Sequence, residues 1–184
     1  MALNDMKNWM DYKGKKFLED IGLVENQFVL DFGCGHGIYT IPASLVVRGK
    51  GRVYAIDKNK EVLTELDLKA KDKELKNIKI IKPVDKFKLP LPKRSVDMIL
   101  LYDVLHLVES RKDLLTELRD VLKPSGILSV YPKHHQRYMN MDLGEVIKEI
   151  ESVGFRLDVK FFKTLMHNDQ FEKGYVLNFK KKFE

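Results

Sequence analysis

This sequence of 184 residues has a single cysteine and no long apolar run. The single cysteine, Cys34, cannot form a disulfide within the chain or an all-cysteine metal cluster, which fits a reducing compartment. The most apolar run, residues 96–108, is interrupted by two aspartates and a histidine and falls short of the ~20 residues that a membrane helix needs. Residues 1–10 contain no apolar segment typical of a secretory signal. We therefore expect a cytoplasmic protein without membrane insertion.

Linkers rich in glycine, serine or proline are also missing from the sequence, as are internal repeats and low-complexity tracts. Hydrophobic residues make up 44% of the chain and charged residues 33%, a globular rather than a disordered composition. A chain of this length typically folds as one domain. We therefore expect a single domain over residues 1–184. Its helical segment at residues 1–26 is either ordinary core or a lid over the site.

The sequence carries an excess of positive charge, with 33 basic and 27 acidic residues and a net charge of +6. Lysines are concentrated at residues 69–88 and 180–182. Such a basic surface can bind nucleic acid or an acidic partner. Because acidic residues are interspersed among the lysines, we expect a solvated surface and keep a nucleic-acid-binding module as the alternative.

Apolar runs and helical patterns alternate along the chain. The runs predict strands at residues 27–30, 53–56, 78–81, 96–101, 127–131, 155–162 and 175–179. Amphipathic stripes predict helices between them, the first over residues 36–48 with Pro42 near its start, and others capped by Asn59, Ser110 and Asp142. This alternation predicts a parallel sheet covered on both faces, and the short link before the last strand predicts an antiparallel pair.

Glycines are concentrated where the first strand meets the first helix, in Asp31-Phe-Gly33-Cys-Gly35-His-Gly37. Glycine lets the backbone approach a ligand closely, and a helix N-terminus presents N–H groups that suit a carboxylate or a phosphate. In open parallel sheets, ligands bind at the carboxyl ends of the strands. Ile38 stands where a dinucleotide fingerprint has its last glycine, which disfavours a nicotinamide oxidoreductase, and no P-loop string occurs.

The glycine loop and four later segments resemble, in order, the motifs of class I S-adenosylmethionine-dependent methyltransferases, over about residues 28–179. The resemblance is nearest to the small-molecule branch that includes ubiquinone and menaquinone methyltransferases. It rests on Asp31-x-Gly33-x-Gly35-x-Gly37, Val53-Tyr-Ala-Ile-Asp57, Pro83-Val84-Asp85, Val96-Asp-Met-Ile-Leu-Leu-Tyr102 and Leu122-Lys-Pro-Ser-Gly-Ile-Leu128. The resemblance implies a Rossmann-like, doubly wound α/β fold with a seven-stranded, mostly parallel sheet and one antiparallel strand near the C-terminus.

S-adenosyl-L-methionine is the cofactor that the resemblance implies, with S-adenosyl-L-homocysteine as the product and a small molecule as the acceptor. RNA or protein acceptors stay open as alternatives, and the oligomeric state is not specified. The resemblance implies that Asp57 holds the ribose hydroxyls, that Asp85 holds the adenine amino group and that Asp31 lies near the methionine ammonium group. The alternative is that these acids cap loops or are solvated. The expected cofactor-binding residues are Asp31, Gly33, Cys34, Gly35, His36, Gly37, Asp57, Lys58, Val84, Asp85, Lys86, Leu101 and Tyr102.

The candidate catalytic residues are His106, His134 and His135. In-line methyl transfer from a sulfonium depends mainly on alignment, and a general base helps only when the acceptor arrives protonated. His106 follows the fourth strand, and His134 and His135 follow the fifth. The alternatives are a packing role for His106 and a metal site or plain surface for the pair. We expect no metal, and we expect Cys34 to fill space in the loop.

Overall fold

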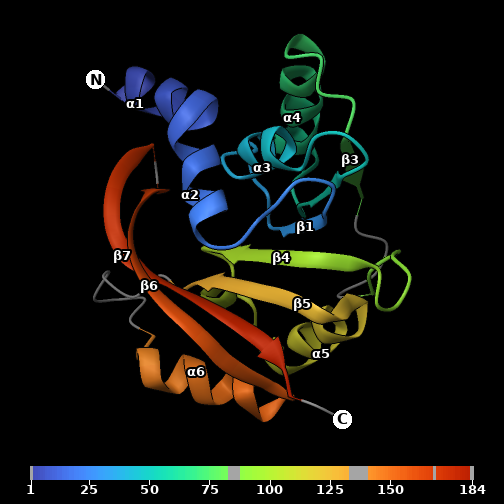
Figure 1. The fold of residues 1–184 in the computed structure, drawn as a ribbon, viewed down its shortest axis with the longest axis vertical. Coiled ribbons are helices and arrows are strands. Elements are labelled where there is room, and N and C mark those ends of the chain that lie inside the picture. The colour runs from blue at the N-terminus through green and yellow to red at the C-terminus, as the bar shows by residue number, and fades with distance from the viewer. Residues whose placement is uncertain (1, 83–87, 133–140, 168, 183–184) are drawn as a thin grey trace.

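The computed structural model describes residues 2–82, 88–132, 141–167 and 169–182. Its centre is a seven-stranded sheet in the order β3-β2-β1-β4-β5-β7-β6 (Figure 1). The strands are β1 (Phe28–Phe32), β2 (Arg52–Ile56), β3 (Ile78–Ile81), β4 (Val96–Tyr102), β5 (Leu122–Tyr131), β6 (Phe155–His167) and β7 (Gln170–Lys181). The helices are α1 (Ala2–Asn8), the π-helix η1 (Trp9–Lys13), α2 (Gly14–Asp20), α3 (Thr40–Val47), α4 (Lys60–Asp72), the 3-10 helix η2 (Leu105–Leu107), α5 (Arg111–Val121) and α6 (Leu143–Ser152).

The direction of the strands confirms the predicted fold. β1 lies between β2 and β4 and is parallel to both, and β3 and β5 continue the parallel sheet on either side. β7 is antiparallel to β5 on one side and to β6 on the other, so β6 runs in the same direction as β1 to β5. The predicted antiparallel pair is therefore present, as a hairpin longer than the apolar runs indicated.

Alternating side chains of the strands form two apolar clusters, one on each face of the sheet. The first cluster joins Val29, Met98 and Leu100 to α2, α3 and α4. The second joins Leu30 and Ile99 to α5 and α6. Figure 1 shows α5 and α6 on the side of the sheet away from α1 to α4. Both faces are thus covered, as expected for a doubly wound sheet.

Two of the three predicted helix caps are formed. The side chain of Asn59 accepts a hydrogen bond from the N–H of Glu61 (2.8 Å), and that of Asp142 accepts one from the N–H of Glu145 (3.0 Å). Ser110 does precede α5, but its side chain makes no capping hydrogen bond. The side chain of an N-cap residue satisfies one of the free N–H groups of the first turn, and at α5 that bond is missing.

Two element boundaries differ from the sequence-based expectation. α3 begins at Thr40 rather than at residue 36, which places Pro42 in its first turn, where a proline is tolerated. β5 begins at Leu122 rather than at residue 127, because Leu122 pairs with Val96 before a register shift in the ladder. Residues 123–126 therefore belong to the irregular start of a strand.

The N-terminal helices pack against the first apolar cluster. Trp9 is 1% exposed, and its indole N–H donates a hydrogen bond to the carbonyl oxygen of Ile38 (2.9 Å), in the loop after β1. The Asn178 side chain on β7 donates to the carbonyl oxygen of Ile21 (2.7 Å). Residues 9–21 are therefore tied both to the glycine loop and to the last strand. None of the helices in the described residues has the length and apolar character to cross a membrane.

Candidate cofactor and acceptor site

The candidate site lies at the edge of the sheet where the parallel strands have their carboxyl ends. Asp57 follows β2, Asp103 follows β4, and Tyr131 and His167 end β5 and β6. Because β6 runs parallel to the central strands, its last residue reaches the same edge. The glycine loop after β1 lies there as well. The topology thus brings together ionisable residues that are far apart in the sequence.

The glycine loop needs glycine for two different reasons. Gly33, Gly35 and Gly37 all have positive φ angles, of 78°, 49° and 84°. A Cβ atom at Gly33 would lie 2.2 Å from Cγ2 of Val104, and one at Gly37 would lie 2.4 Å from Cδ1 of Leu66. A Cβ at Gly35 would meet no atom within 4 Å. Gly33 and Gly37 therefore permit close packing, whereas Gly35 faces open space.

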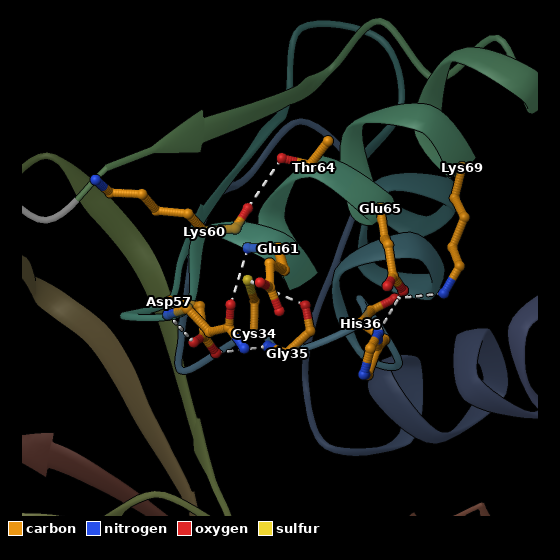
Figure 2. Close-up of polar contacts among 10 residues, drawn as sticks. Cys34, Gly35, His36, Asp57, Lys60, Glu61, Thr64, Glu65 and Lys69 are labelled. Atoms are coloured by element: carbon orange, nitrogen blue, oxygen red, sulfur yellow. Dashed lines mark hydrogen bonds and ion pairs between the residues drawn. The ribbon is translucent and has the colours of Figure 1, made fainter.

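Asp57 connects the second strand to the glycine loop (Figure 2). One carboxylate oxygen accepts a hydrogen bond from the N–H of Gly35 (2.9 Å), and the other accepts one from the N–H of Asn59 (2.9 Å). The side chain is only half-buried. A carboxylate has about four lone-pair positions, so Asp57 can accept further hydrogen bonds from a ligand.

Asp31 is a buried carboxyl at the end of β1. It is 3% exposed, and it accepts a hydrogen bond from the hydroxyl of Thr40 (2.5 Å), the first residue of α3. Burial raises its pKa to about 7, while the Thr40 hydrogen bond acts in the opposite direction and the charge of Asp57 adds to the rise. Asp31 therefore links β1 to α3 and is almost entirely shielded from solvent.

The residues at this edge fit S-adenosylmethionine. Open space lies in front of Gly35, a half-buried carboxylate with spare acceptor capacity adjoins it, and the N-terminus of the eight-residue α3 follows the loop. A ribose requires hydrogen-bond acceptors for its hydroxyls, and a carboxylate group favours a helix N-terminus. Asp57 would hold the ribose, and the loop from Gly35 to Gly37 would hold the methionine end.

The remaining predicted residues of the loop region have diverse environments. The exposed imidazole of His36 lies 2.8 Å from the carboxylate of Glu65 on α4, and the ammonium group of Lys69 donates to the His36 carbonyl oxygen (3.4 Å) (Figure 2). Lys58 is exposed. Cys34 is buried, and burial together with Asp31 and Asp57 raises the pKa of its thiol, so the sulfur remains protonated.

The two predicted residues of β4 face opposite sides of the sheet. The Leu101 side chain is fully buried in the cluster beneath α5 and α6, so its backbone is the part that can meet a ligand. The Tyr102 hydroxyl shares a hydrogen bond with that of Ser129 (2.8 Å), and its ring packs edge-on against Tyr39 at 4.6 Å between centroids.

His106 lies half-buried in η2, just beyond β4. The other five predicted residues, Val84, Asp85, Lys86, His134 and His135, lie outside the described residues.

A pair of residues that sequence reasoning did not single out lies at the same edge. Nδ1 of His167 hydrogen-bonds Oδ2 of Asp103, across 64 positions of sequence. Oε1 of Glu172 lies 4.0 Å from the same nitrogen, and this oxygen accepts a hydrogen bond from the hydroxyl of Tyr131 (2.6 Å). The signal in the sequence was weak, because the predicted last strands ended before His167 and began after Glu172.

A cavity of about 650 Å³ lies elsewhere, at the amino ends of β2 and β3, and is lined by side chains of mixed charge from residues 11–19, 44–49 and 74–77. It is on the opposite edge of the sheet from the glycine loop and does not belong to the site. Within the described ranges, no group of three or more His, Cys, Asp and Glu side chains is placed to hold a metal ion.

Relatives of known sequence point to the same chemistry as this geometry. The pattern of the methyltransferase domain family matches residues 30–130. A demethylmenaquinone methyltransferase of Lactobacillus johnsonii is 30% identical over 130 residues, which are 71% of this chain and 52% of that protein. A sterol 24-C-methyltransferase of Pneumocystis carinii is 26% identical over 150 residues, 72% of this chain and 38% of that protein. The chain thus spans about half the length, or less, of the curated relatives it matches.

A solved structure agrees over nearly the whole chain. The crystal structure of a SAM-dependent methyltransferase from Aquifex aeolicus is 27% identical, with a TM-score of 0.78, and covers 97% of this chain and 98% of that one. The family resemblance predicted from the sequence is therefore confirmed. The chain belongs to the methyltransferase domain family, within the class I fold that uses S-adenosylmethionine.

Proposed function

We propose that this chain binds S-adenosylmethionine and transfers its methyl group to a small-molecule acceptor, acting in the cytoplasm as a single domain. The observation that supports the proposal is the hydrogen bond between Asp57 and Gly35. It places a carboxylate next to the open space in front of Gly35, at the carboxyl end of the sheet. The cofactor supplies a methyl group on a positively charged sulfur, which is already activated for displacement.

Binding and alignment are the tasks that fall to the chain. Asp57 accepts the ribose hydroxyls while it remains bonded to the loop, so the sugar and the glycine loop are fixed relative to each other. Trp9 and Tyr39 form part of the buried wall of the proposed site. The Trp9 indole is hydrogen-bonded to the loop after β1, and the Tyr39 hydroxyl donates to the carbonyl oxygen of Met166 (2.7 Å). Exclusion of water and alignment of reactants supply much of the rate in such a displacement. In this proposal residues 9–20 belong to the wall of the site.

A small molecule is the favoured acceptor for two reasons. The relatives are named for demethylmenaquinone and sterol methylation, and both names denote small apolar acceptors. Aromatic side chains surround the carboxyl ends of β4 and β5, where Tyr102 packs edge-on against Tyr39 and Tyr131. These three rings are buried, so they form an apolar layer beneath the proposed site, and an apolar environment favours an apolar acceptor.

Calorimetric titration with S-adenosylhomocysteine tests the proposal. We expect the folded chain to bind it and Asp57→Ala to weaken binding by roughly tenfold to a hundredfold, because a charge-assisted hydrogen bond contributes about 1.5–3 kcal/mol. Asp67→Ala is the matched control, since Asp67 is a half-exposed acid on α4 that pairs with Lys71, and its removal should leave affinity unchanged. Absence of binding to the folded wild-type chain would contradict the proposed function.

A further inference from the structure

The cavity at the amino ends of β2 and β3 has the size of a small-molecule site. Its volume of about 650 Å³ lies within the range of about 300–1,000 Å³ that is typical of ligand pockets. It is lined by residues of η1 and α2, of the end of α3, and of the connection from α4 to β3. The proposed cofactor site lies at the carboxyl ends of the same strands, so the length of the sheet separates the two places.

Polar contacts between the walls hold this cavity open. The side-chain amide of Asn77, just before β3, donates a hydrogen bond to the carbonyl oxygen of Ser44 in α3 (2.8 Å). Nζ of Lys73, just after α4, lies 3.0 Å from Oδ1 of Asp11 on η1. The connection from α4 to β3 is therefore bonded to both of the other walls, and the cavity is formed before any ligand enters it.

Several charged side chains that line the cavity already have an ionic partner. Nζ of Lys15 lies 3.7 Å from Oε1 of Glu19, and Nζ of Lys16 lies 2.6 Å from Oδ1 of Asp20. Asp11 is engaged in the contact with the lysine that follows α4. Because these charges are compensated within the fold, they contribute little net attraction for a ligand.

Two cations of the cavity lack such a partner. Arg48, at the end of α3, donates from Nε to the carbonyl oxygen of Leu45 (2.9 Å), and its two terminal nitrogens have no bond to any described residue. Lys76 likewise forms no ion pair in the part of the chain that the structure describes, and Glu74 is a lining acid in the same state. Positive charge is therefore in excess, and a guanidinium fork with free N–H groups suits a phosphate.

An exposed aromatic ring belongs to the same lining. Tyr12 on η1 is 73% exposed although it lines the cavity. η1 is a π-helix, a rare form that occurs frequently at functional sites. Leu45 and Leu75 add half-buried apolar surface to the cavity. A ligand with a planar apolar part can pack against these side chains and remove them from water.

We propose that this cavity is a second ligand site, which binds a small aromatic molecule that carries a phosphate group. Arg48 and Lys76 bind the phosphate, whose two negative charges match these two cations. The ring of Tyr12 packs against the planar part of the ligand. Because the cavity lies away from the glycine loop, binding at this site does not depend on the proposed methyl transfer.

The experiment is a calorimetric titration of the full chain with 1-naphthyl phosphate, in excess S-adenosylhomocysteine and again without it. We expect one bound probe per chain and the same affinity in both titrations. Inorganic phosphate lacks the ring and 1-naphthol lacks the charge, so we expect each to bind about tenfold more weakly. Loss of probe binding in the presence of S-adenosylhomocysteine would place the probe in the cofactor site and overturn the inference.

Substitutions of exposed lining residues locate the probe. Arg48→Gln and Lys76→Gln should each weaken binding about tenfold, because each removes one charge-assisted contact with the phosphate. Tyr12→Ser should weaken it about threefold through loss of the ring contact. These side chains are exposed, so we expect urea unfolding of the variants to match that of the wild-type chain.

Lys50→Gln is the matched control. Lys50 is an exposed cation two residues from Arg48, but it does not line the cavity, so the variant loses the same charge outside the site. We expect it to bind the probe within about twofold of wild type, because solvent and salt screen a charge outside the site. Equal weakening by Lys50→Gln and Arg48→Gln would show attraction to the overall charge and would refute the site, as would failure of the wild-type chain to bind the probe. A chain that binds the probe but not S-adenosylhomocysteine would instead contradict the proposed function alone.

Discussion

Asp31 is the residue at which burial and charge are most clearly in conflict. Its carboxyl is surrounded by apolar strands, and the hydroxyl of Thr40 is the donor that it holds. Desolvation raises its pKa in the folded chain from 3.8 to about 7. The folded state therefore keeps its proton over a pH range in which the unfolded chain has lost it.

The consequence is a pH-dependent stability that can be assigned to one side chain. Stability from this group is fully present below pH 4, and it falls as pH rises toward 7, by an amount of the order of 4 kcal/mol if the whole shift is expressed. Asp31→Asn removes the titration while leaving an acceptor for Thr40. We expect the variant to gain stability relative to wild type between pH 4 and 7, measured by urea unfolding at several pH values. A difference that stays constant over that range would refute the assignment.

The Asp103–His167 pair illustrates what sequence patterns do not reveal at the scale of residues. Asp31 and Asp57 were found because each follows a recognisable strand and glycine signal. Asp103 followed such a strand too, but its partner lies 64 positions later at the end of β6. The contact depends on how far the hairpin extends, and the polar residues near its tip carried no strand signal.

At the scale of elements, the loop from β1 to α3 contains one glycine that folding requires, Gly37, and one that ligand binding requires, Gly35. Gly37→Ala places a methyl group 2.4 Å from Leu66 at a positive φ of 84°, so we expect a loss of about 1–3 kcal/mol in stability. Gly35→Ala meets no atom within 4 Å at a φ of 49°, and we expect a loss of about 1 kcal/mol.

For ligand binding, we expect Gly35→Ala to be the more damaging of the two variants, the reverse of their ranking for stability. The methyl group of Gly35→Ala enters the space proposed for the methionine end of the cofactor, so we expect affinity for S-adenosylhomocysteine to fall at least tenfold. Gly37→Ala should bind more nearly as wild type does wherever it is folded. Urea unfolding and calorimetry on both variants check the two rankings, and equal affinities for the two variants would argue against the open space as a binding site.

Most elements could be predicted because their apolar spacing is regular, and the boundaries that failed have local causes. The loop after β1 contains three glycines with positive φ, which postpones the helix to Thr40. β5 starts early because Leu122 pairs with Val96 across an irregular ladder, a contact between segments that no local pattern encodes. Hairpin lengths likewise depend on pairing between β6 and β7 rather than on hydrophobicity.

At the scale of the whole molecule, part of the positive charge of the two lysine-rich segments is engaged with neighbouring groups. Lys71 and Lys73 pair with Asp67 and Asp11, and Lys180 pairs with Asp158. Lys182 donates to the carbonyl oxygen of Glu151 (3.1 Å). The two lysine-rich segments noted in the sequence therefore carry compensated charge in part, which favours a solvated surface over a nucleic-acid interface.

Binding to nucleic acid should accordingly be weak. We expect duplex RNA to bind with a Kd of roughly 10⁻⁴ M at physiological salt, the weak end of non-specific binding, and to dissociate further as salt rises. Fluorescence anisotropy across a salt series measures this. Sub-micromolar binding at physiological salt would instead support the alternative of a nucleic-acid-binding module.

The position of β7 between β5 and β6 has a consequence for biosynthesis. Residues 155–167 of β6 hydrogen-bond to β7 alone, and β7 is made after them. While a ribosome is still adding residues 170–181, β6 has no neighbour in the sheet, and His167 cannot reach Asp103. The contact between His167 and Asp103, and the bond from Tyr39 beside the glycine loop to Met166, can therefore form in the paired sheet only after the hairpin has left the exit tunnel.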